Sequence, residues 1–184
     1  MGNASQPVRS RATDADVDGA VPHVAVVGAS EASDDDLALA EALGRELAGR
    51  GAVVVCGGLG GVMEAVCRGA RAAGGRTIGI LPGGDRRHAN PHVEVAVATG
   101  LGEGRNLLVV RNADVVVAVG GELGTLSEIA FALRLGKPVV GVATWELAKG
   151  GEAVDAIVRV SSAAEAAGAA VAAAQEVLRS TTSE

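Results

Sequence analysis

Short runs of mostly β-branched residues, most of them followed by glycine, restrict the fold of this chain more than any other feature. The clearest runs are 23–27, 52–56, 76–81, 114–119 and 137–142. They are apolar nearly throughout instead of alternating, which is typical of parallel strands covered on both faces. Segments with helical spacing of apolar residues separate the runs. We therefore predict an α/β fold, a three-layer Rossmann-like parallel sheet with helices on both faces.

The remaining segments complete this architecture. Helices are predicted at about 34–49, 62–73, 105–113, 125–135 and 163–178, and weaker strand patterns lie at 93–98 and 156–160. Residues 1–20 are polar and have no period, so we expect a disordered tail. Residues 21–184 are then a single Rossmann-like nucleotide-binding domain.

Composition excludes several classes of function. With 22 acidic and 16 basic residues the net charge is -6, and one Phe, one Trp and no Tyr leave few rings for base stacking. Binding of nucleic acid is therefore not expected. No apolar run is long enough to span a bilayer and the N-terminus lacks a signal-peptide pattern, so we expect a cytoplasmic protein. Cys56 and Cys67 fit no zinc pattern and are expected to be buried thiols, with no metal site.

Glycine-rich loops follow the predicted strands at 57–61 and 120–124, and each precedes a helix. The N-terminus of a helix has unpaired N–H groups and a partial positive charge, so anions bind there. The carboxyl ends of parallel strands share one edge of the sheet. Two such loops predict a ligand that carries a phosphate and a second polar part, with the phosphate at residues 121–125.

Two charged residues are candidates for chemistry at this edge. A helix that descends from Arg105 and a strand that returns at 114–119 bring this cation back to the level of Glu128. Each has a simpler interpretation: Arg105 as a surface charge, and Glu128 as the last member of a Thr125-x-x-Glu128 capping box. The functional interpretation is that both side chains face the ligand.

Three segments resemble a known family. Residues 57–65 (GGLGGVMEA) resemble the first glycine motif of the lonely-guy family, long labelled possible lysine decarboxylases. Arg105-Asn106 resembles its arginine, and residues 120–128 (GGELGTLSE) resemble its PGGxGTxxE motif. Residues 57–70 and 124–139 are also similar to a bacterial branch that includes the molybdenum cofactor carrier proteins. Gly120 replaces the motif's proline and Glu122 its second glycine.

The resemblance implies two functions, which the sequence leaves open. Lonely-guy enzymes are phosphoribohydrolases that cleave the N-glycosidic bond of nucleoside 5'-monophosphates, and this activity would make Arg105 and Glu128 catalytic. The alternative is a non-catalytic carrier of the molybdenum cofactor, a pterin with a phosphate. No cofactor is required in either case, and an AMP-like nucleotide or the molybdenum cofactor is the expected ligand. A plain structural or partner-binding module is a third possibility. The predicted binding residues are Gly28, Ser30, Gly57, Gly58, Gly60, Gly61, Met63, Asn106, Gly120, Gly121, Glu122, Leu123, Gly124 and Thr125.

The predicted helix at 125–135 also suggests self-association. Ile129, Phe131, Leu133 and Leu135 lie on more than one of its faces, which exceeds what one contact with the sheet requires. We therefore expect a homodimer or a higher homo-oligomer, as is common in the family that the chain resembles.

Overall fold

A computed structural model describes residues 20–181. Its main sheet has seven strands in the order β4-β3-β2-β1-β5-β6-β9, and every neighbouring pair is parallel. The strands are β1 (His23–Gly28), β2 (Val53–Cys56), β3 (Arg76–Leu81), β4 (Val95–Ala98), β5 (Val115–Val119), β6 (Val139–Val142) and β9 (Val158–Val160). The strand order reverses between β1 and β5, and ligands of such sheets bind outside this switch point. The predicted tail, except Ala20, lies outside the described residues.

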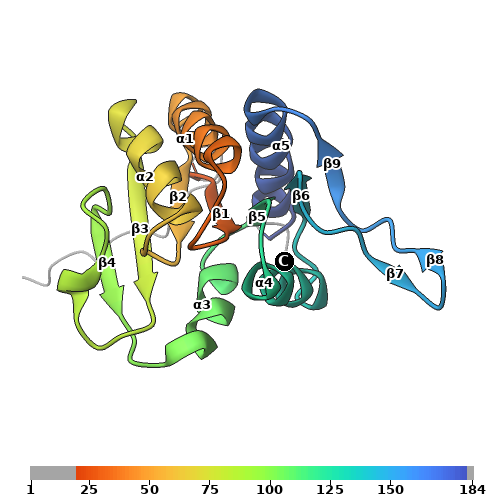
Figure 1. Cartoon of the computed structure of the whole chain (residues 1–184). Coiled ribbons are helices and arrows are strands. Elements are labelled where there is room, and N and C mark those ends of the chain that lie inside the picture. Colours follow the sequence, from red (N-terminus) through yellow and green to blue (C-terminus); the bar gives the residue numbers. More distant parts are fainter. Residues whose placement is uncertain (1–19, 182–184) are drawn as a thin grey trace, which may run out of the picture.

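Helices cover both faces of the sheet, as Figure 1 shows. They are α1 (Asp34–Gly49), α2 (Val62–Ala72), α3 (Asn106–Arg111), α4 (Leu123–Arg134) and α5 (Ala163–Thr181). Successive strand residues point to opposite faces: Val24 and Val26 pack with α1, α2 and α5, whereas Ala25 and Val27 pack toward α3 and α4. The predicted three-layer parallel α/β fold is confirmed.

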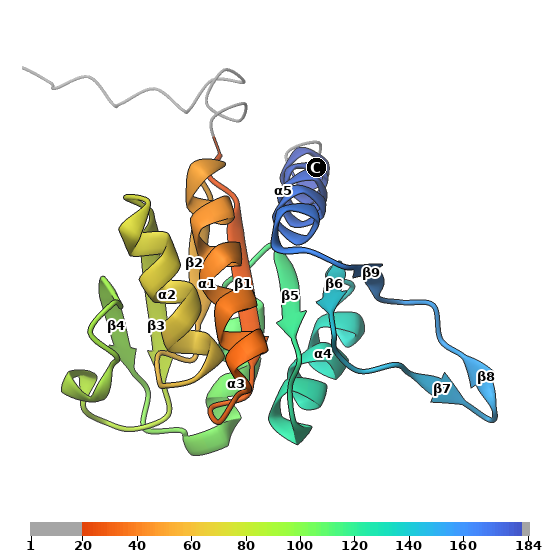
Figure 2. The same ribbon diagram turned by 45° about the horizontal axis from the view of Figure 1, so that its top comes forward.

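The ends of several helices and strands differ from the sequence prediction, mainly where the local sequence pattern is weak. A short 3-10 helix, η3 (Gly102–Arg105), precedes α3, so Arg105 lies at the junction and not inside the longer predicted helix. A second, η2 (Arg86–His88), lies between β3 and β4. Helix α4 begins at Leu123, two residues before the predicted start. The antiparallel hairpin of β7 (Ala148–Lys149) and β8 (Glu152–Ala153) was not predicted, and Figure 2 shows it extending away from the sheet.

The two cysteines lie in the core between β2 and α2. Cys56 ends β2, Cys67 lies in α2, and both are buried free thiols whose Sγ atoms are 3.4 Å apart. The hydrogen bond between the thiols, together with burial, raises the pKa of Cys67. The expected buried thiols are confirmed. Within residues 20–181 no helix has the length and apolar character that a membrane span requires.

Candidate ligand-binding site

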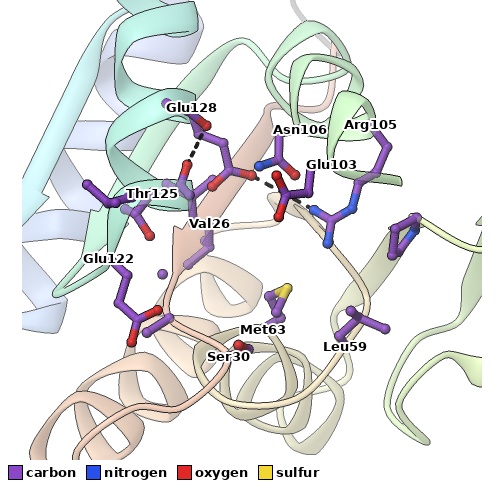
Figure 3. A pocket seen from close by; sticks show the side chains of 18 of the residues that line it. Val26, Ser30, Leu59, Met63, Glu103, Arg105, Asn106, Glu122, Thr125 and Glu128 are labelled. Atoms are coloured by element: carbon purple, nitrogen blue, oxygen red, sulfur yellow. Dashed lines mark hydrogen bonds and ion pairs between the residues drawn. The ribbon is translucent and has the colours of Figure 1, made fainter. Parts of the chain in front are cut away.

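A cavity of about 730 Å³ opens at the carboxyl ends of β1, β2 and β5, beside the switch point of the sheet. Figure 3 shows side chains from the β1 loop, α2, α3 and α4 gathered around it. Its volume is within the range of small-molecule sites in proteins, about 300 to 1,000 Å³. The site is therefore large enough for a nucleotide or a pterin.

Most of the sequence-predicted residues meet at this cavity. Those that line it are Gly28, Ser30, Gly57, Met63, Arg105, Asn106, Glu122, Leu123, Gly124, Thr125 and Glu128. The structure does not place Gly58, Gly60, Gly61, Gly120 or Gly121 in the lining. Gly120 and Gly121 have φ angles of 52° and 111° and form the turn that leads from β5 to α4. These glycines shape the loops, and their neighbours provide the surface.

Two of the glycines allow close approaches that build the site. A Cβ atom at Gly57 would lie 2.3 Å from the Nη1 atom of Arg105, so the guanidinium packs directly on the backbone of this loop. Gly61 is the N-cap of α2 with φ 64°, and a Cβ atom there would lie 2.3 Å from the carbonyl oxygen of Ala29. The loops after β1 and β2 are therefore in backbone contact, which only glycine permits.

The Arg105 side chain is buried without strong partners. It is 9% exposed, and its Nη1 atom lies 3.9 Å from the Oε1 atom of Glu128, which is 8% exposed. Its Nε atom has no hydrogen-bond partner among the described residues. Burial lowers the pKa of Arg105, and the nearby carboxylate opposes this shift. A buried guanidinium with an unsatisfied donor provides a strong attraction for an anion.

Burial also changes the chemistry of Glu128. Removal from water raises the pKa of its carboxyl group to about 7, although Arg105 acts in the opposite direction. Near neutral pH this group can therefore either hold or release a proton. Such a shifted carboxyl in a cavity is typical of functional sites.

The capping interpretation of Glu128 is wrong. Helix α4 begins with Glu122 as its N-cap, so Thr125 is an internal residue and the Thr125-x-x-Glu128 box does not form. The surface interpretation of Arg105 is also wrong, because this side chain is buried. Both charged groups therefore belong to the cavity, as the functional interpretation predicts.

The loop after β6 holds the β5–α4 turn in place. The Thr144 hydroxyl donates to the carbonyl oxygen of Gly120 at 2.5 Å, and the Trp145 Nε1–H donates to that of Glu122 at 3.2 Å. Ala143, just before them, has φ 49°, an uncommon conformation for a residue with a Cβ atom. The start of α4 is therefore fixed by hydrogen bonds from outside the helix.

Sequence reasoning missed several lining residues. Val26, Val27, Ala29, Leu59, Pro82, Glu103, Ser127 and Phe131 also contribute to the wall. Most are apolar or small and carry no chemical signal. Glu103 is different: it lies between two glycines just before Arg105, and a carboxylate in a glycine-rich loop could have marked it.

Comparisons with known proteins agree with the predicted resemblance. The molybdenum cofactor binding protein from the phototrophic bacterium Rippkaea orientalis is similar in structure, with a TM-score of 0.70 and 33% identity over 89% of this chain and 98% of that chain. The molybdenum cofactor carrier protein of Chlamydomonas reinhardtii has a TM-score of 0.71 and 30% identity, over 83% of this chain and 98% of that chain. An uncharacterized protein of Archaeoglobus fulgidus is 40% identical over 119 residues, which are 65% of this chain and 78% of that protein.

A family model matches nearly all of the described residues. The model of the SLOG cluster4 family matches residues 21–178, from just before β1 into the last turns of α5. The matched segment contains every element that lines the cavity. The chain belongs to the SLOG cluster4 family.

Proposed function

We propose that this protein binds and carries a phosphate-bearing pterin of the molybdenum cofactor type. The observation that carries the proposal is the Arg105 guanidinium, which is buried in the cavity wall and lacks a hydrogen bond on Nε. The similarity to proteins that bind or carry the molybdenum cofactor supports this choice of ligand. The cofactor is cargo in this proposal, and the chain's own residues supply binding and shielding from water.

The phosphate is held by Arg105 in this proposal. A phosphate oxygen would accept from the guanidinium, replacing the weak pairing at 3.9 Å with a charge-assisted hydrogen bond. Because the pKa of Glu128 is about 7, this carboxyl can take up a proton when a dianion arrives beside it. The Arg105–Glu128 pair can thus adapt its charge to the ligand.

A phosphate bound at Arg105 differs from the expectation drawn from the sequence, which placed the phosphate at residues 121–125. The N-cap of α4 is Glu122, and its side chain lies in the cavity lining at the start of the helix. A carboxylate there is favoured by the helix dipole and repels a phosphate, although it accepts no hydrogen bond from the first turn. The proposal therefore places the phosphate near Arg105 and leaves the α4 N-terminus to an uncharged part of the ligand.

Binding of molybdenum cofactor released from a purified molybdoenzyme tests the proposal. We expect the wild type to retain pterin and molybdenum in near-equal amounts after gel filtration, measured by chromatography of the oxidised pterin and by metal analysis. The Arg105→Met variant should lose most of this retention. Arg87→Met, which removes a guanidinium that is 85% exposed and outside the cavity, should retain it. Equal retention by wild type and Arg105→Met would contradict the proposal.

A second candidate is hydrolysis of nucleoside 5'-monophosphates. The specific observation in its favour is Glu128, a buried carboxyl with a pKa of about 7 beside a cation, which suits a general acid or base. If the protein is such an enzyme, Glu128→Gln should reduce turnover by roughly two or more orders of magnitude while binding persists. A wild type that leaves AMP, GMP and related monophosphates intact would exclude this candidate and favour the carrier.

Self-association through α4 is also proposed. Of the four residues that suggested it, Ile129 is fully buried within one chain, whereas Phe131, Leu133 and Leu135 remain only partly buried, although they pack against the core. A dimer that packs α4 against α4 would cover them. Light scattering at working concentrations should give the mass of a dimer or larger, and a monomer mass would contradict this.

A further inference from the structure

The cavity is electrostatically polarised along α4. Among the described residues that line it, Arg105 alone is basic, whereas Glu103, Glu122 and Glu128 are acidic. Arg105 pairs with Glu128, and Glu122 lies six residues before Glu128, about 9 Å along the helix axis. Figure 3 shows Glu122 and Arg105 on opposite sides of the group of lining residues. Figure 3 also shows Glu103 beside Arg105, so the Arg105 end suits an anion when Glu128 holds a proton, whereas the Glu122 end suits a hydrogen-bond donor or a cation.

The carboxylate of Glu122 is available for a ligand. In the described part of the chain it accepts no hydrogen bond and forms no ion pair, although its backbone oxygen accepts from Trp145. The Trp145 and Thr144 hydrogen bonds hold the backbone on both sides of Gly121. The backbone of Glu122 is thus held in place before a ligand binds, and its exposed side chain extends from a fixed turn into the cavity lining.

A carboxylate has a defined preference among ring systems. Its two oxygens lie side by side and accept two parallel N–H donors, as they do from a guanidinium. The 2-amino group and the adjacent ring N–H of a pterin or a guanine present this same pair of donors. Adenine presents one amino group beside a ring nitrogen that is an acceptor, and this acceptor would face the carboxylate unfavourably.

We propose that Glu122 determines ligand specificity by accepting hydrogen bonds from the 2-amino-4-oxo edge of the ligand ring, while Arg105 holds the phosphate at the opposite end. The inference rests on the proposed function and assigns recognition of the pterin ring to Glu122. Guanine presents the same two donors and is the alternative ring that the test separates. It assigns a role to the carboxylate that occupies the glycine position of the related motif.

Matched ligand pairs test this assignment. Isothermal titration calorimetry would compare GMP with IMP, which lacks only the 2-amino group, and with AMP. A second pair is the 6-phosphooxymethyl derivative of pterin and that of lumazine, in which an oxo group replaces the 2-amino group. We expect the wild type to prefer the 2-amino member of each pair by roughly 10- to 100-fold, the range for hydrogen bonds to a charged group. Comparison of the two 2-amino ligands then identifies the ring: tighter binding of the pterin derivative than of GMP indicates a pterin, and the reverse indicates guanine.

Variants separate this proposal from the function on which it rests. Glu122→Gln should remove most of the preference within each pair, and it should weaken IMP less than GMP because IMP offers only the ring N–H to this side chain. Arg105→Met should weaken all ligands by a similar factor and keep the preference. Glu31→Gln, which removes a carboxylate from the neighbouring β1–α1 loop outside the cavity lining, should behave as the wild type.

Two results would overturn the specificity role of Glu122. Equal affinity of the wild type for GMP, IMP and AMP and for both pteridines would show that the ring edge is not recognised, while phosphate binding would stand. A preference that persists in Glu122→Gln would assign recognition to another residue. If none of these ligands binds to a wild type that retains the molybdenum cofactor, the specificity role of Glu122 fails and the proposed function stands; a wild type that retains neither contradicts both.

Discussion

The Nη1 atom of Arg105 and the Oε1 atom of Glu128 lie 3.9 Å apart in side chains that are only 9% and 8% exposed. This separation is too long for a hydrogen bond, so neither charge is well compensated by the other. Burial of two charges costs more than such a contact returns. The pair is therefore arranged for a ligand and not for the stability of the empty protein.

Removal of Arg105 should show that the pair does not stabilise the empty protein. At pH 6 the Arg105→Met variant should be as stable as the wild type or more stable by about 1 kcal/mol, because a buried, unsatisfied guanidinium is lost. Glu128, without its cation, keeps its proton at this pH. Urea denaturation in phosphate-free buffer measures the free energy of unfolding. A loss of more than about 2 kcal/mol would mean that the ion pair stabilises the fold.

The raised pKa of Glu128 predicts a pH dependence of stability. The folded protein holds this proton up to about pH 7, whereas the same carboxyl in the unfolded chain has its ordinary pKa of 4.5. Between these values the folded state binds more protons, so the free energy of unfolding falls as pH rises. The contribution of this carboxyl to that fall is on the order of 3 kcal/mol.

Glu128→Gln isolates this contribution. Relative to the wild type, the variant should gain stability between pH 5 and pH 8, measured by urea denaturation at several pH values. Glu103→Gln, which removes an exposed carboxylate from the same cavity, is the matched control. If the Glu128→Gln profile ran parallel to that of the wild type, the carboxyl would titrate normally.

The neighbouring glycines before α2 should differ sharply in their tolerance of alanine. Gly61→Ala places a Cβ atom 2.3 Å from the Ala29 carbonyl at a φ of 64°, and should cost more than about 2 kcal/mol of stability. Gly60→Ala meets only the Ser30 oxygen at 3.9 Å and should cost about 0.5 kcal/mol or less. Chemical denaturation compares the two. Similar losses would contradict the backbone contact between the β1 and β2 loops.

The buried thiols should be inaccessible in the folded protein. Cys56 and Cys67 are both fully buried, so a thiol reagent such as dithiobis(nitrobenzoate) should react with neither in native buffer. In denaturant both should react, which gives the two thiols that the sequence contains. Rapid reaction of the folded protein would mean that the β2–α2 region opens locally.

The sequence predicted the layers of the fold because its signals are strong and local. Valine runs such as 53–55 are typical of buried strands, and the glycines after them mark the edge of the sheet. The strand order and the β7–β8 hairpin could not be predicted in this way. Two-residue strands have no measurable alternation, and the order of strands depends on packing between distant segments.

The candidate site was predictable only in part, for a similar reason. Arg105 and Glu128 come together because two elements return to one edge, and the alternation of helix and strand is enough to infer that. The start of α4 was misplaced because Thr125 and Glu128 have the spacing of a capping box, whereas Glu122 occupies the N-cap position in the structure. Apolar walls such as Leu59 and Phe131 carry no pattern that distinguishes them from core residues.

The hydrogen bond from Trp145 to the Glu122 carbonyl has a practical consequence. The sequence has one Trp and no Tyr, so the emission of the protein comes almost entirely from this indole. That indole contacts the turn that positions the candidate recognition residue, and it needs no engineered label. The fluorescence of Trp145 therefore reports on the N-terminus of α4, and a change in the environment of the Glu122 peptide will shift the emission of this indole.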